Sequence, residues 1–176
     1  MFVKIDGVSA GDPVYSGFTP AFTPAATPTD VLLINGFAGT RVKIWRLFLS
    51  TLQTSAGINT WQLLKYSTAN SGGTPVAVTK VPHEAGHAAA GASLQYYTAN
   101  PTPGTSLGSV FSFRLNSPAV ATVGTGDLQG FYIDFVSTIG IPIVLNGPAQ
   151  GLALNFGGAA LPAGLSVIAG FTWSEG

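Results

Sequence analysis

The chain has 176 residues and no Cys; 46% of its residues are hydrophobic, only 8% are charged, and 7 basic residues balance 7 acidic ones. These numbers exclude disulfides and thiolate metal sites, and they exclude electrostatic binding of nucleic acid, which requires clustered Lys and Arg. They also predict a single domain without a secretion signal or a membrane-spanning segment, because no run of about 18 apolar residues is present.

So few charges indicate a surface that is covered by other protein. An ordinary soluble domain has roughly 25% charged residues, and a neutral monomer with so few charges tends to self-associate. We therefore expect copies of the chain, or a larger assembly, to cover much of its surface. The alternative is a β-protein that uncharged Ser, Thr and Asn side chains keep soluble.

The first 30 residues predict a short strand at 2–6 and then an extended arm, followed by a sandwich domain at 31–176. Four prolines in the arm forbid a helix and favour extended backbone, and aromatic side chains along such an arm need a groove to lie in. The arm either packs across its own sheet, reaches a neighbouring subunit or is disordered. The prolines are Pro13, Pro20, Pro24 and Pro28, and the aromatic residues, which are candidate interface positions, are Tyr15, Phe18 and Phe22.

The rest of the chain consists of short alternating runs separated by turns rich in Gly, Pro, Asn and Thr. In residues 165–173, every second side chain is apolar, which is typical of a strand with one buried face. With no convincing long amphipathic helix, the pattern predicts an all-β, single-domain antiparallel sandwich or barrel, and a jelly roll fits best. The expected strands are 31–35, 41–49, 58–66, 76–81, 92–98, 107–115, 128–137, 141–146, 151–156 and 165–173.

The run at residues 41–49 begins by alternating and then breaks its pattern. Arg41 and Lys43 face outward, whereas Arg46 falls on the inward side. Either a β-bulge near Trp45 shifts the register, or both faces are covered there. The outward-facing candidate interface positions on the strands are Arg41, Lys43 and, in the run at 128–137, Tyr132.

One motif suggests a metal site. The segment His83-Glu84-Ala85-Gly86-His87 matches the H-E-x-x-H pattern of zinc hydrolases, in which two His one helical turn apart bind zinc and the Glu activates a water. A helix is needed for this spacing, but Pro82 just before the motif disfavours one, and no third ligand follows at a usual distance. We expect an exposed loop or turn here, and no metal ligand, cofactor or catalytic residue.

Other catalytic arrangements are weaker. Asp127 and Asp134 resemble a glycosidase pair only in residue type, because Asp127 lies in a Gly-rich turn and Asp134 points outward from an expected strand. The segment Gly124-Thr125-Gly126 lacks the helix that a phosphate loop requires, and no nucleophile is evident, so the chain is not expected to be an enzyme. The aromatic residues Tyr96 or Tyr97, Tyr132 and Trp61 can stack on sugars, although they serve equally well at a protein interface.

A five-residue pattern, Tyr-x-Thr-Ala-Asn, occurs twice, at residues 66–70 and 96–100. Each copy ends an expected strand and enters a turn with Gly or Pro. Because Asn can adopt left-handed backbone geometry or bond its own backbone, the repeat predicts the same strand exit used twice and not a ligand motif.

With these residues considered, the chain resembles small virion proteins of tailed bacteriophages, of the jelly-roll head-decoration type. The resemblance covers about residues 28–173 and implies a fold and a virion context, with a variable stretch after Val81-Pro82 in place of a zinc-binding helix. The segments that carry it are Tyr66 to Thr74, Val81-Pro82-His83, Tyr97 to Thr102, Leu145 to Asn155 and Trp173-Ser174-Glu175.

Composition, arm and resemblance together predict a structural virion protein that is assembled in the cytoplasm of a host bacterium. It is expected to decorate or cement the capsid as a homo-oligomer, with a trimer the first expectation, and to bind itself and other virion proteins. The alternative is a tail or fibre module that binds the host surface or a glycan. A zinc hydrolase acting through His83, Glu84 and His87 is a remote alternative.

Overall fold

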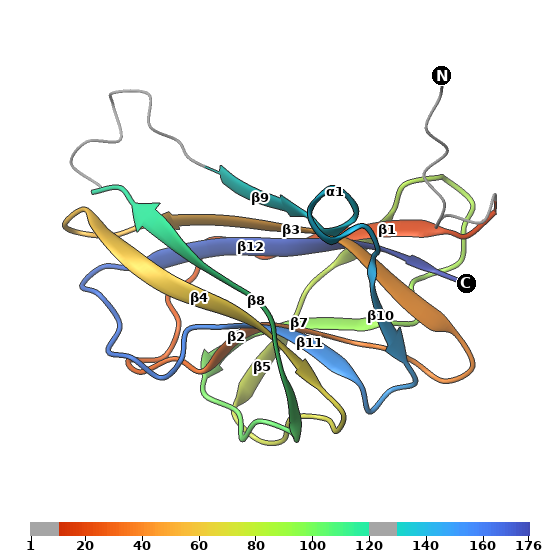
Figure 1. The fold of residues 1–176 in the computed structure, drawn as a ribbon, viewed down its shortest axis with the longest axis horizontal. Helices are drawn as coiled ribbons and strands as arrows, with labels where there is room; N and C mark the ends of the chain where they lie inside the picture. Colours follow the sequence, from red (N-terminus) through yellow and green to blue (C-terminus); the bar gives the residue numbers. More distant parts are fainter. Residues whose placement is uncertain (1–10, 120–129) are drawn as a thin grey trace.

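A computed structural model describes residues 11–119 and 130–176 and shows two antiparallel sheets packed face to face (Figure 1). The prediction of an all-β sandwich is confirmed. No helix in the described part of the chain is long and apolar enough to cross a membrane. The strands are β1 (Val14–Phe18), β2 (Asp30–Asn35), β3 (Arg41–Leu52), β4 (Gly57–Tyr66), β5 (Thr74–Ala77), β6 (Lys80–Pro82), β7 (Ser93–Ala99), β8 (Ser106–Ser117), β9 (Gly130–Asp134), β10 (Ile143–Asn146), β11 (Gly151–Asn155) and β12 (Ser166–Glu175), and the helix is α1 (Phe135–Ile139).

The sheets contain 6 strands each. Sheet A, the upper layer in Figure 1, has the order β10-β3-β12-β1-β6, with β9 also pairing with β3. Sheet B, the lower layer, has the order β5-β7-β2-β11-β4-β8. Consecutive strands change sheets at β1 to β2, β2 to β3, β3 to β4, β5 to β6, β6 to β7, β8 to β9, β10 to β11 and β11 to β12. Such winding is typical of a jelly roll.

The core lies between the two sheets and is filled by alternating side chains. β12 turns Val167, Phe171 and Trp173 into the core and leaves Ile168 outside, as its sequence pattern predicts. From sheet B, Trp61 is fully buried against the same core. Because burial of a large apolar side chain contributes about 1.5–3 kcal/mol, this core stabilises the fold without any disulfide.

β3 contains a β-bulge, which is one of the two explanations that its broken alternation leaves open. Arg46 pairs with Thr172 but Ile44 pairs with Trp173, so Trp45 is an extra residue in β3. The bulge reverses the alternation, because a shift of one residue moves each side chain to the other face. Beyond it the odd-numbered residues of β3 are buried and the even-numbered ones face outward.

Two of the predicted strands differ from those in the structure. The run at 76–81 is divided, because Val78 enters the core between the sheets and its N–H donates to the Leu94 carbonyl. Val76 therefore belongs to β5 in sheet B and Val81 to β6 in sheet A.

The predicted strand at 128–137 ends early; its first two residues lie outside the described part of the chain. β9 stops at Asp134, whose side chain accepts a hydrogen bond of 3.1 Å from the Ser137 N–H and so begins α1 as its N-cap. Gly140, with φ of +83°, ends the helix. In this short segment the cap formed by Asp134 favours a helix more strongly than the alternating pattern favours a strand.

The segment expected to be an extended arm is part of the sandwich. β1 pairs with β12 on one side and β6 on the other, and Phe22 still bridges to Val167 after the strand ends. The described part of the arm therefore packs on its own sheet, and its backbone completes sheet A, so the sandwich is not separated from it at residue 30. The strand expected at 2–6 lies outside the described residues.

Although Ile58 on β4 stays 72% exposed, part of the outer face of sheet B is covered by the chain's own loops. Beneath them lies a second, smaller core of Leu33, Tyr66, Tyr97 and Ala153, all on strands of sheet B. Each of these four side chains is at most 3% exposed, so this face has no apolar group left for another molecule to cover at that point.

A buried carboxylate anchors these loops. Asp30 is 1% exposed and accepts hydrogen bonds from the Tyr66 hydroxyl (2.9 Å), the Asn155 amide (2.6 Å) and the Asn70 amide (2.6 Å). Burial and the nearby charge of Asp30 raise the pKa of Tyr66 well above its ordinary value, so the phenol remains a donor. Asn100, the second Asn of the repeated pattern, accepts from the Thr29 N–H and donates to the Thr27 carbonyl.

Candidate interaction surface

The outer face of sheet A carries a row of aromatic side chains that crosses four strands. Tyr132 on β9 pairs with Phe48 on β3, Phe48 with Gly170 on β12, and Gly170 with Phe18 on β1. The ring centroids of Tyr132 and Phe48 are 5.5 Å apart and those of Phe48 and Phe18 are 5.9 Å apart, both in edge-on contact. We call Phe18, Phe48 and Tyr132 the aromatic strip.

Two glycines make room for the strip. Gly170 has no side chain to separate Phe18 from Phe48, and a Cβ there would collide with the Phe18 ring and the Gly17 carbonyl. Gly130 does the same on β9, where a Cβ would meet the Phe48 ring. The rings therefore lie across the backbone of the sheet, and each glycine serves close packing.

The strip is exposed and has apolar neighbours. Phe18 is 47% exposed and Tyr132 61% exposed, and Ile168 and Val81 on the same face are 37% and 55% exposed. Scattered apolar residues on a surface need no explanation, but a contiguous group marks a site of interaction.

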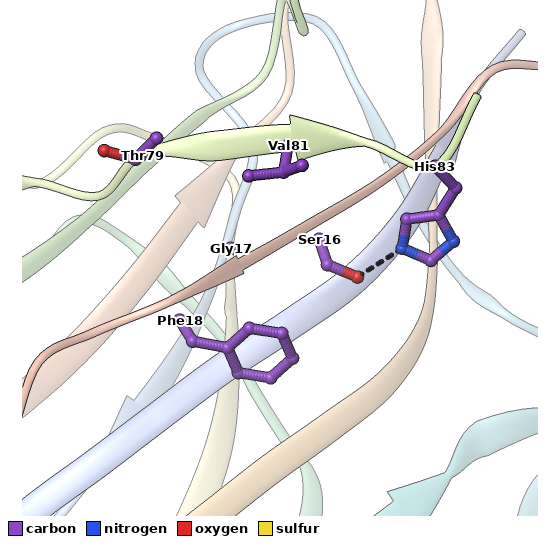
Figure 2. A pocket seen from close by; sticks show the side chains of 6 residues that line it. All are labelled: Ser16, Gly17, Phe18, Thr79, Val81 and His83. Atoms are coloured by element: carbon purple, nitrogen blue, oxygen red, sulfur yellow. Dashed lines mark hydrogen bonds between the residues drawn. The ribbon is translucent and has the colours of Figure 1, made fainter. Parts of the chain in front are cut away.

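A shallow hollow of about 480 Å³ lies at the β6 end of the strip (Figure 2). Figure 2 shows Phe18 and Val81 on neighbouring strands at its wall, with Ser16 and His83 at the far end joined by a hydrogen bond of 2.7 Å. Its lining combines the Phe18 ring and the aliphatic Val81 with the polar side chains of Ser16, Thr79 and His83, which suits a protruding side chain or a small amphipathic group.

A polar row runs beside the aromatic strip. The Ser16 hydroxyl also lies 3.0 Å from the Thr172 hydroxyl, and Arg46 Nε donates to Asp134 Oδ2 at 2.9 Å. Burial acts to raise the pKa of Asp134, but hydrogen bonds from Ser137 and Arg46 outweigh it and hold that pKa below its ordinary value. The aromatic strip is thus bordered by satisfied polar groups, as the rim of a protein interface is.

The pair Ser16 and His83 has the spacing of a nucleophile and its base but lacks the other parts of a hydrolase. Ser16 lies mid-strand, paired with Thr172 and Val81, so the backbone N–H groups around it belong to the sheet and not to an oxyanion hole. No carboxylate in the described residues orients His83, because Glu84 bonds to His87 instead.

The segment His83-Glu84-Ala85-Gly86-His87 forms an exposed loop, as its context predicts, and not a helix. Gly86 adopts a φ of +103°, which breaks the helical spacing between the histidines. His83 bonds to Ser16 and His87 to Glu84, so the two rings serve different partners. In the described part of the chain no three His, Asp or Glu side chains gather where they could hold a metal ion.

The far end of this loop is tied to the C-terminal strand. The Glu175 carboxylate is buried and accepts from the N–H groups of Gly91 and Ala92, each at 3.0 Å, and from the Trp173 indole at 2.9 Å. The Tyr15 hydroxyl donates to the Ala88 carbonyl at 2.9 Å, and burial together with the charge of Glu175 raises the pKa of Tyr15. This anchoring fixes β6 and His83 beside the hollow.

Of the six predicted interface residues, two lie on the aromatic strip and four do not. Phe18 and Tyr132 meet on the aromatic strip, as described above. Tyr15 is 2% exposed and stacks on Trp173, so it belongs to this chain's own core. The remaining three lie elsewhere: Phe22 is half-buried against Tyr96, Lys43 is paired with Asp12 at 2.6 Å, and Arg41 is exposed at the opposite end of β3.

Phe48 is the member of the strip that sequence reasoning missed. Its position became outward only because Trp45 is bulged, which reverses the alternation that precedes it. The sequence leaves a bulge and two covered faces as alternative explanations, and counting parity from Arg46 onward finds Phe48 only under the first. Two of the proposed sugar-stacking residues are not available, because Trp61 is 0% and Tyr97 is 3% exposed.

Comparisons with family models, with curated proteins and with solved structures found no match.

Proposed function

We propose that the protein is a structural component of a tailed-bacteriophage particle that binds other virion protein through the outer face of sheet A. In this role it decorates or cements the capsid as a homo-oligomer. The aromatic strip is the observation that carries the proposal, because it is a preformed, contiguous apolar surface on a chain with only 8% charged residues.

The size of this face favours an assembly over a simple pair. From the spacing of strands and the rise per residue, the face from β9 to β6 covers on the order of 500 Å², which is less than the roughly 800 Å² per partner of a standard stable interface. One copy therefore binds weakly, and many copies held around a shell bind strongly through their combined contacts. Decoration of a repeating lattice is a role with this property.

The energetics point to the same residues. Apolar burial contributes roughly 25 cal/mol per Å² before the costs of association are subtracted, and binding energy usually concentrates in a few central, aromatic residues. Phe18, Phe48 and Tyr132 are the exposed or half-exposed aromatic residues that cross this face from β9 to β1.

The test is rebinding of purified protein to particles from which it has been removed. Phe18→Ser with Tyr132→Ser should reduce co-sedimentation with the particles at least tenfold and remove any protection of the particles against heat. Ile58→Ser, on the outer side of β4 and 72% exposed, is a matched control and should bind like the unchanged protein. Equal binding by the double variant and the control would exclude this face as the attachment site, and gold labelling confined to tails would exclude a role on the head.

The second candidate is a tail or fibre module that binds a glycan, and the hollow beside Phe18 favours it. A sugar ring needs an aromatic face and hydroxyl partners, and Phe18, Ser16 and His83 lie together there. Glycan-array binding that is lost in Phe18→Ser, with labelling on the tail, would support this role in place of capsid decoration.

A further inference from the structure

The edges of the two sheets differ in how well they are protected against pairing with another strand. Sheet A ends at β6, which has 3 residues including Pro82, and at β9 and β10, which have 5 and 4 residues and share one side of β3. Sheet B ends at β5, which has 4 residues including Pro75, and at β8, which has 12 residues and no Pro. Within the described residues β8 is therefore the one long edge without proline, and natural proteins usually protect such an edge.

The first half of β8 has that protection. Its register with β4 skips Leu107 and Val110, so both are bulged. Serine hydroxyls also bind the backbone there: Ser106 accepts from the Gly108 N–H, and Ser109 donates to the Phe111 carbonyl. Bulges twist an edge away from partners, so this half is a poor template for a further strand.

The second half of β8 is regular, and no strand within residues 11–119 and 130–176 pairs with its outer side. Residues 111–117 pair with residues 63–57 of β4 without interruption, which leaves a straight outer edge. Phe111 and Phe113 face the core side but are only half-buried, and Phe113 stacks on Phe131 with ring centroids 4.8 Å apart. Arg114 is exposed and forms no ion pair with any described residue.

We propose that this half of β8 pairs antiparallel with β8 of a second copy of the chain, about a two-fold axis at Phe113. The sequence of residues 111–115 is self-complementary in that register: Phe111 lies opposite Leu115 of the second copy, and Phe113 lies opposite its own counterpart. All apolar pairs fall on the core side, where they cover the half-buried rings. On the outer side Arg114 lies opposite Ser112, so the two arginines do not face each other directly.

The contact joins the two copies of sheet B into one continuous sheet. A two-fold contact gives an even number of subunits, so this inference replaces the trimer expected from composition, arm and resemblance together. Only five residues per strand pair, and the solution dimer is therefore weak and dependent on concentration. The inference does not rest on the virion role, because it concerns an edge on the sheet opposite to the aromatic strip.

The test measures the dimer dissociation constant by sedimentation equilibrium for variants at exposed positions of β8. Ser112→Glu places a carboxylate opposite Arg114 of the second copy twice per dimer and should tighten the dimer several-fold, whereas Ser112→Lys should weaken it by on the order of tenfold. The double variant Ser112→Lys with Arg114→Glu should restore the dimer, since opposite charges again face each other.

Asn116→Glu is the matched control. It adds the same charge on the same face of β8, but opposite the bulged Val110 of the second copy. The dimer dissociation constant of this variant should stay within about twofold of that of the unchanged protein. Thermal unfolding checks that each variant is folded. A chain that stays monomeric at all concentrations, an oligomer of odd number, or a Ser112→Glu effect equal to that of Asn116→Glu would each overturn the inference. Binding to the particle through the aromatic strip is measured in a separate experiment, and none of these results would exclude it.

Discussion

The two outer faces of the sandwich are built from similar strands but differ in whether the chain covers their apolar side chains. On sheet B the chain folds its own loops over one part of the face, buries Leu33, Tyr66, Tyr97 and Ala153 beneath them and anchors them through Asp30. On sheet A it leaves Phe18 and Tyr132 exposed in ring contact with Phe48.

The difference shows that the chain can cover an apolar face when its fold requires it. Covering sheet B takes two turns and a buried carboxylate with three side-chain donors, which costs desolvation and ordering of the loops. No described segment covers the aromatic strip in this way, although Gly170 and Gly130 allow the rings to pack closely on the sheet. We therefore interpret the part of the outer face of sheet B around Asp30 as covered within the chain, and the outer face of sheet A as covered by a partner.

The largest expected effect is on the covered face. Asp30→Ala leaves the Tyr66 hydroxyl and the amides of Asn70 and Asn155 without their buried acceptor, and should lower the free energy of unfolding by about 3 kcal/mol or more. Denaturant unfolding measures the loss. A change below about 0.5 kcal/mol, the range of ordinary surface substitutions, would mean that the carboxylate does not hold the loops.

A smaller effect is expected at the glycine under the aromatic strip. Gly170→Ala introduces a methyl group that meets the Phe18 ring and the Gly17 carbonyl, and should cost about 1–3 kcal/mol of stability through overpacking. Phe18→Ala in the same chain should recover part of this loss, as thermal unfolding of the single and double variants can show. If the changes in unfolding free energy of the two single variants simply add in the double variant, the Phe18 ring does not lie over Gly170.

The stability that Tyr66 contributes on the covered face should fall at alkaline pH. The pKa of Tyr66 is raised in the folded state above its ordinary value of 10.0, so folding favours the protonated phenol, and its contribution to stability is lost as pH rises above 10. The slope per phenol is at most about 1.4 kcal/mol per pH unit. Tyr66→Phe should reduce the slope of unfolding free energy against pH between 10 and the folded pKa; an unchanged slope would contradict a buried donor at this position.

The smallest effect on stability is expected on the open face. Phe18→Ser and Tyr132→Ser each remove an exposed ring and should change the free energy of unfolding by no more than about 1 kcal/mol, although together they should weaken binding to a partner at least tenfold. A loss of several kcal/mol in either variant, measured in denaturant, would show that the strip stabilises the fold itself and would remove the contrast between the faces.

Much of this arrangement follows from the sequence, and the exceptions have physical reasons. Alternation in residues 165–173 predicts β12, and the broken pattern near Trp45 gives the bulge as one of two explanations, because both depend on which side chains enter the core. The end of β9 at Asp134 depends on a local cap that competes with alternation. The meeting of Phe18, Phe48 and Tyr132 depends on which strands lie side by side, and chain order does not determine that pairing.

The Asp30 cluster shows the same limit. The repeated Tyr-x-Thr-Ala-Asn pattern predicts two strand exits at which Asn takes left-handed geometry or bonds its own backbone. Both copies do end a strand, but neither Asn has a positive φ, and Asn70 and Asn100 bond groups that are distant in the sequence. That Tyr66, Asn70 and Asn155 converge on one buried carboxylate follows only from the order of strands in sheet B, where β2, β11 and β4 are neighbours.

Hydroxyl-radical footprinting of the protein, free and on the assembled particle, tests the central claim most directly. The account predicts that Phe18, Phe48 and Tyr132 react in the free protein and become at least several-fold less reactive on the particle, while Ile58 on sheet B keeps its reactivity. Equal reactivity of the aromatic strip in both states, with protection at Ile58 instead, would contradict it.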